Sequence, residues 1–180
     1  MVNSGLDEKL LKKYGFKVID LAYLMDDQRA ILQMELSKQR PNKRVLHLLK
    51  RLASVSKRVE GLSTQLKGYD MDTKAMEWII EMYSSTPPSS PEYKDIEDVV
   101  HAYTKVQIWL GGFFTLLNAF SHSINLRQLS AAEKIMKKME LEVERARKIF
   151  REYGDALKKL RAFVLGGHEE DEHPYLLYFT

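Results

Sequence analysis

The stretch Asn42-Lys-Arg-Val-Leu-His-Leu-Leu-Lys-Arg-Leu-Ala-Ser-Val-Ser-Lys-Arg-Val-Glu-Gly-Leu-Ser-Thr-Gln-Leu-Lys67 decides the fold of this 180-residue chain. Its apolar residues alternate spacings of three and four, and they are Val45, Leu48, Leu52, Val55, Val59, Leu62 and Leu66. This spacing places the apolar residues in one stripe along a helix, as in the seam of a coiled coil. The stretch therefore predicts a long helix that packs against a second helix, in this chain or in another copy.

A second seam of the same kind lies near the end of the chain. It consists of Met139, Val143, Ala146, Phe150, Tyr153, Leu157, Leu160 and Val164. Ser130 and Glu133 have the spacing of a capping box, in which each side chain accepts from the backbone N–H of the other residue. We therefore expect a helix that begins at Ser130 and ends at Gly166-Gly167.

The rest of the chain also has helical patterns. We expect one helix over residues 6–36, which Gly15 can break, and two more over residues 73–83 and 92–121. Residues 84–91 contain three prolines among small polar residues and predict an exposed loop.

No strand pattern competes with these helices, so the sequence predicts an all-α fold. We expect a bundle of about five helices, two of them long and heptad-patterned, because helices bury their apolar stripes against one another. Residues 1–165 form one domain in this interpretation, and residues 166–180 form an acidic and aromatic tail.

The segment from Val99 to Phe120 is apolar on nearly every side, which predicts a helix that is buried on most sides. Gly111 and Gly112 in its middle favour a close helix crossing or a bend, since each costs about 1 kcal/mol relative to alanine. The most apolar run, residues 108–120, is shorter than the roughly 20 residues that span a bilayer. We therefore expect no membrane contact from this segment.

Cysteine is absent, which excludes disulfides, thiolate metal ligands and a cysteine nucleophile. Its absence also suits a reducing compartment. The first residues have neither the basic nor the apolar part of a signal peptide. These observations predict a cytoplasmic protein.

The first seam helix carries a cationic repeat. Pairs of Lys and Arg recur every seven residues, immediately before every second seam residue, as Lys43, Arg44, Lys50, Arg51, Lys57 and Arg58. On a helix these six side chains, which we call the basic ridge, form a charged edge roughly 22 Å long. The surrounding residues 38–68 have a net charge of +8, whereas residues 69–100 have −6.

Three interpretations of the basic ridge remain open. It can bind the phosphates of a nucleic acid, which would release counterions without reading bases. It can meet an acidic protein surface, either the segment 69–100 of this chain or a partner. It can also be an ordinary solvated flank, although such flanks usually mix in acids and Glu60 is the only one here. Because no aromatic residue interrupts the ridge, nucleic-acid binding would be insensitive to sequence.

Signals of catalysis are weak. Asp98 with His101, and Glu170 with His173, have the spacing of carboxylate–imidazole metal ligands, but a di-metal bundle needs two further carboxylates facing one core. No phosphate-binding loop, nucleophile elbow or apolar carboxylate pair is present. We therefore expect neither an enzyme nor a metal or other cofactor.

The last apolar residues follow an acidic stretch and are Tyr175, Leu176, Leu177, Tyr178 and Phe179. They can pack on their own core or dock in a groove of a neighbouring subunit. The interpretation we favour is a non-catalytic helical subunit that binds nucleic-acid backbone through the basic ridge, in an assembly with itself or other helical subunits. The alternative is a helical scaffold protein whose seams and tail bind protein partners.

Overall fold

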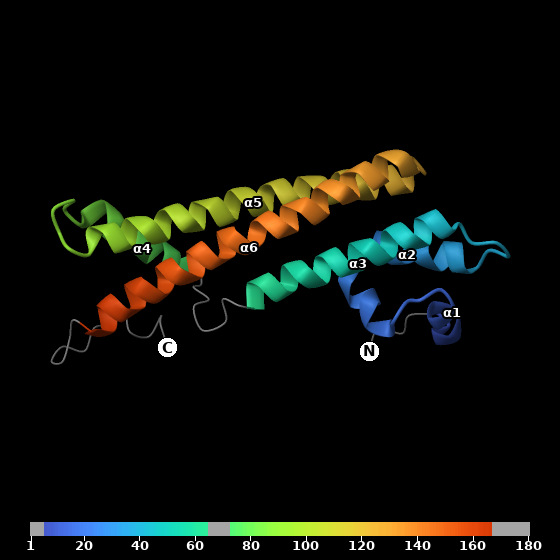
Figure 1. The fold of residues 1–180 in the computed structure, drawn as a ribbon, viewed down its shortest axis with the longest axis horizontal. Helices are drawn as coiled ribbons and strands as arrows, with labels where there is room; N and C mark the ends of the chain where they lie inside the picture. Colours follow the sequence, from blue (N-terminus) through green and yellow to red (C-terminus); the bar gives the residue numbers. More distant parts are fainter. Residues whose placement is uncertain (1–5, 65–72, 167–180) are drawn as a thin grey trace. The chain divides into compact units, whose positions relative to one another are not determined.

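The computed structural model describes residues 6–64 and 73–166, and within these residues the chain is helical with no strand (Figure 1). The elements in chain order are α1 (Glu8–Lys13), the 3-10 helix η1 (Val18–Tyr23), α2 (Asp26–Leu36), α3 (Lys43–Thr64), α4 (Thr73–Ser85), α5 (Tyr93–Asn125) and α6 (Leu129–Gly166). The predicted all-α class is confirmed.

The N-terminal segment, for which the sequence allowed a break at Gly15, is divided into α1, η1 and α2. Gly15 follows the end of α1 with a φ of +79°, a left-handed conformation that suits glycine. The Gly15 N–H donates to the Lys12 carbonyl at 3.1 Å, and the Phe16 N–H donates to the Leu11 carbonyl at 2.9 Å. These two hydrogen bonds form a Schellman motif, and the burial of both Leu11 and Phe16 gives the apolar contact that accompanies it. The motif ends α1 and turns the chain.

The described residues belong to two compact units, and the chain passes between them three times. The first unit draws on residues up to Glu60 and on Gly112–Val143. The second draws on Gly61–Gly111 and on the residues from Glu144 onward. The long helices α5 and α6 therefore each contribute one segment to each unit.

In the first unit, α3 is covered on more than its predicted seam. Val45, Leu48, Leu52 and Val55 are buried as the heptad pattern predicts. Leu46, Leu49 and Ala53, which lie beside the seam, are buried as well. With Val45 at heptad position a, the residues at positions a, b, d and e face the protein in the first two heptads. The residues at positions c, f and g lie on the solvent side.

In the second unit, the core is built on the second seam. Phe150, Tyr153, Leu157 and Leu160 are buried. The Trp109 ring meets the Phe150 ring edge-on, with centroids 5.7 Å apart. Along their described parts, both seams are therefore buried within this chain, except that Val59 is half-buried.

Helix α5 departs from the expectation that it is buried on most sides. Ile108 is 70% exposed and Phe114 is 57% exposed. Apart from the helix's own backbone, no described atom lies within 4 Å of a Cβ added to Gly111 or Gly112. Of the two expected roles of these glycines, a close crossing or a bend, the close crossing is therefore not found among the described residues. A helix packed along one face buries only that face, whatever residues occupy the other. Among the described helices, none combines the length and the apolar character needed to cross a membrane.

The proline-rich residues 86–92 connect α4 to α5, as predicted. The rings of Tyr83 and Tyr93 stack across the ends of this connection with centroids 5.4 Å apart. The predicted capping box at the start of α6 is wrong, because the helix begins at Leu129 and the Gln128 carbonyl accepts its first hydrogen bond, from Ala132 at 3.0 Å.

Candidate nucleic-acid interface

All six cations of the basic ridge lie on the side of α3 that faces away from the core. The lysines occupy heptad position f and the arginines position g, while position c between them holds His47, Ser54 and Gly61. The residues at c and f are exposed, and the arginines range from exposed to half-buried. Burial at the other positions of α3 leaves this strip as its outer surface, so the sequence placed the ridge correctly.

We call the lysines of the ridge the lysine column (Lys43, Lys50 and Lys57) and its arginines the arginine column (Arg44, Arg51 and Arg58). The two columns differ in their ion-pair partners. Lys43, Lys50 and Lys57 are exposed, and within the described residues none of them forms an ion pair. Seven residues of helix rise about 10.5 Å, so the three ammonium groups repeat at roughly that interval. No acid among the described residues therefore offsets the positive charges of these three lysines.

The arginine column faces α6. The Arg44 Nε donates to the Glu133 carboxylate at 3.0 Å. Arg51 donates through Nε to Glu140 Oε1 at 2.8 Å and through Nη2 to Glu140 Oε2 at 2.6 Å, the bidentate geometry that suits a guanidinium and a carboxylate. Both pairs join residues that are 89 apart, so in the first unit α3 and α6 run parallel and in step, heptad for heptad (Figure 1).

These pairs lower the pKa of both glutamates. The hydrogen bond from Arg51 lowers the pKa of Glu140 below its usual value, and the charges of Arg51 and Arg58 lower it further against the opposing effect of burial. The hydrogen bond from Arg44 similarly lowers the pKa of Glu133. Both carboxylates are therefore ionised at neutral pH and offset part of the positive charge of the arginine column.

The acidic partners that the structure shows for Arg44 and Arg51 lie outside the segment 69–100. The segment 69–100 was one expected source of neutralising charge, and its first residues, 69–72, lie outside the described residues. The two pairs that the structure shows use Glu133 and Glu140 of α6. Their seven-residue spacing matches that of Arg44 and Arg51, and this match is the signal that could have identified them.

The two units carry opposite net charges. The residues assigned to the first unit include 17 basic and 10 acidic side chains, a net charge of +7. Those assigned to the second include 11 basic and 15 acidic side chains, a net charge of −4. The basic ridge therefore lies in the unit whose net charge is positive, which favours an encounter with a polyanion.

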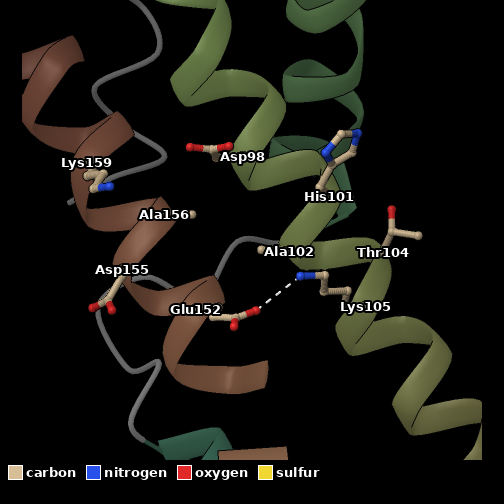
Figure 2. Close-up of a pocket in the computed structure, with 9 residues that line it drawn as sticks. All are labelled: Asp98, His101, Ala102, Thr104, Lys105, Glu152, Asp155, Ala156 and Lys159. Carbon is tan, nitrogen blue, oxygen red and sulfur yellow. Dashed lines mark hydrogen bonds and ion pairs between the residues drawn. The ribbon is translucent and has the colours of Figure 1, made fainter. Parts of the chain in front are cut away.

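A different kind of surface lies in the second unit, where α5 and α6 leave an open hollow of about 570 Å³ (Figure 2). Ala102 and Ala156 face each other across it, and these small side chains create the space. Lys105 and Glu152 bridge it with an ion pair of 3.2 Å. The hollow is lined by both signs of charge, which does not favour one class of charged ligand.

The hollow contains one of the two candidate metal motifs. Asp98 and His101 both line it, but the Asp98 carboxylate pairs with Lys94 at 2.8 Å and the imidazole of His101 points away from Asp98 (Figure 2). Among the described residues, no group of three or more potential metal ligands comes together. The second motif, Glu170 with His173, lies outside the described residues, as do the tail residues from Tyr175 to Phe179.

Comparison of the chain with protein-family models, with curated proteins and with solved structures found no match.

Proposed function

We propose that this protein is a non-catalytic helical subunit that binds the phosphate backbone of nucleic acid through the basic ridge of α3. The observation that supports this proposal most directly is the lysine column. Lys43, Lys50 and Lys57 are exposed, regularly spaced and without an ion pair to any described residue. Three fixed ammonium groups on a rigid helix give a linear array of phosphate contacts that reads no bases.

The arginine column contributes in a second way. Arg44 and Arg51 are oriented by Glu133 and Glu140, so their guanidinium groups are held beside the lysine column rather than free to rotate. A phosphate at the ridge would have to share each guanidinium with a carboxylate. We therefore infer that the lysines supply most of the affinity and that the acids of α6 moderate it.

The heptad register supports a further part of the proposal. The in-step pairs between α3 and α6 favour a coiled-coil-like contact between these helices within the chain, and exposed apolar side chains such as Phe114 offer contacts to other subunits. We propose that the protein acts in a larger or repeating assembly in the cytoplasm, with copies of itself or with other helical subunits.

The rival proposal is a scaffold protein without a nucleic-acid ligand. One observation favours it: Arg44 and Arg51 already have partners inside the chain. Another observation weighs against a scaffold that uses its seams to bind partners. Apart from the half-buried Val59, the described residues of both seams are buried and do not present an apolar surface to a partner. A scaffold would have to use other side chains, such as Ile108 and Phe114, or the tail residues 175–179.

The two proposals are separated by measuring binding to a mixed-sequence duplex by fluorescence anisotropy over a range of salt concentrations. We expect binding at low salt that weakens steeply as salt rises, and much weaker binding by a variant with Lys43→Glu, Lys50→Glu and Lys57→Glu. Since each phosphate contact contributes about 0.9 to the slope of log affinity against log salt, the triple variant should flatten this slope by about 2.7.

The matched control replaces the same three lysines by arginine, which keeps the charge and should keep the affinity. Circular dichroism of each variant checks that the helices remain folded. Absence of binding by the wild type at low salt would refute the proposed function, and binding that survives the charge reversal would place it on another surface.

A further inference from the structure

The N-terminal segment lies beside the lysine side of the basic ridge. At one point Lys50 approaches the turn after α1 so closely that a Cβ atom added to Gly15 would lie 2.8 Å from its Nζ. Further along, the nearby carboxylate of Glu60 raises the pKa of the Tyr23 hydroxyl, so these two side chains lie close together. The chain from Gly15 to Tyr23 therefore follows α3 from Lys50 to Glu60, on the side opposite to Glu133 and Glu140.

This neighbouring segment is itself cationic. Lys12 and Lys13 are in the last turn of α1, and Lys17 immediately precedes η1. All three side chains are exposed, and none forms an ion pair with a described residue. The protein thus presents a second group of positive charges next to the lysine column, and the basic surface has width as well as length.

The described surface of α3 itself has no Phe, Tyr or Trp ring on which an unpaired base can stack. Helix α3 contains no Phe, Tyr or Trp, and its exposed positions between the two cationic columns hold His47, Ser54 and Gly61. The aromatic residue at the nearby turn is Tyr14, and the Lys13 ammonium lies over its ring, 5.6 Å from the centroid. Proteins that bind single strands rely on base stacking, worth about 1–3 kcal/mol per base.

From these observations, and resting on the proposed function, we infer that the ligand is a double-stranded nucleic acid and that Lys12, Lys13 and Lys17 are phosphate contacts in addition to the ridge. A duplex hides the faces of its bases and presents two rows of phosphates, so it suits a broad cationic surface without aromatic residues. It also carries about one charge per 1.7 Å of its axis and releases more counterion per contact than a single strand does.

The first measurement compares the affinity of the full chain for a duplex with its affinity for each of the two separated strands, at the same salt concentrations. We expect tighter binding and a steeper salt dependence for the duplex. Equal affinities for the duplex and the single strands would overturn the inference and leave the proposed function standing. If neither ligand binds, the proposed function itself fails.

The second measurement uses a variant with Lys12→Glu, Lys13→Glu and Lys17→Glu. We expect its duplex affinity at about 0.1 M salt to fall more than tenfold, because each lost phosphate contact removes its share of counterion release. Its single-strand affinity should change much less. The control variant has arginine at the same three positions and should bind the duplex as the wild type does.

Two further results would overturn the inference. One is normal duplex binding by the variant with Lys12, Lys13 and Lys17 changed to Glu, while the variant with Lys43, Lys50 and Lys57 changed to Glu does not bind. This result would confine the contacts to α3. The other is competition by inorganic polyphosphate as strong as that by the duplex at equal phosphate concentration, since this would show a surface that selects charge alone. Thermal unfolding followed by circular dichroism identifies any variant whose loss of binding comes from loss of the fold.

Discussion

Replacing Glu133 and Glu140 by glutamine should strengthen the binding of nucleic acid. In the wild type, Glu133 accepts a hydrogen bond from Arg44 at 3.0 Å, and Glu140 accepts two from Arg51 at 2.8 and 2.6 Å. Glutamine keeps the size of each side chain and removes its negative charge. The two guanidinium groups would then offer their full charge to phosphate.

The magnitude follows from the number of cations released. Each additional phosphate contact steepens the plot of log affinity against log salt by about 0.9, so two arginines should steepen it by about 1.8. Over a fourfold increase in salt, the variant should therefore lose roughly 12-fold more affinity than the wild type loses. At low salt the variant should bind more tightly than the wild type.

The assay is fluorescence anisotropy with a labelled duplex at several salt concentrations. A control variant with Asp26→Asn and Asp27→Asn on α2 makes the same change in net charge without touching the arginine column. The reasoning is refuted if Glu133→Gln with Glu140→Gln leaves the slope unchanged, or if the control steepens it equally. Urea unfolding should show only a modest loss of stability, because part-exposed ion pairs contribute about 1 kcal/mol or less.

Three predictions concern stability, measured by urea unfolding. Glu35→Gln should cost about 3 kcal/mol, because the buried carboxylate pairs with Arg127 at 2.6 Å and Lys38 at 2.7 Å. Burial acts to raise the pKa of Glu35, but these partners outweigh it and hold the pKa low, so the difference from wild type should shrink as pH falls through that value. Gly112→Ala should stabilise α5 by up to about 1 kcal/mol, and a loss would indicate a hidden contact. Gly15→Ala should destabilise by about 1–2 kcal/mol, because φ is +79°; no change would contradict the assigned turn.

The parts of the fold that the sequence predicted are those governed by local periodicity. Spacings of three and four determine which side of a helix is apolar, and the described residues of both seams are buried as expected, apart from the half-buried Val59. Periodicity does not determine how many neighbours a helix has. Helix α5 is apolar on nearly every side, yet Ile108 and Phe114 are exposed, because burial depends on what the rest of the chain supplies.

The candidate site was likewise predictable only where it depends on local periodicity. The position of the six cations relative to the seam could be read from the sequence, since it depends only on the heptad. The matching spacing of Glu133 and Glu140 was visible in the sequence, but their pairing with the arginines depends on the parallel register of α3 and α6, which joins residues 89 apart. The approach of Lys50 to Gly15 could not be read from the sequence either. The sequence allowed a break at Gly15, but the direction in which the chain turns depends on the Schellman motif that forms there.

The order in which the chain builds its two units limits how the protein can be dissected. The first unit needs residues from before Glu60 and from Gly112–Val143, and the second needs the two stretches that alternate with them. Any single break in the backbone between Gly61 and Val143 therefore separates segments that belong together. Neither unit can be obtained by trimming the gene from one end. A stand-alone version of the basic unit would require deleting an internal stretch, joining Glu60 to Gly112 with a new linker, and ending the chain after Val143.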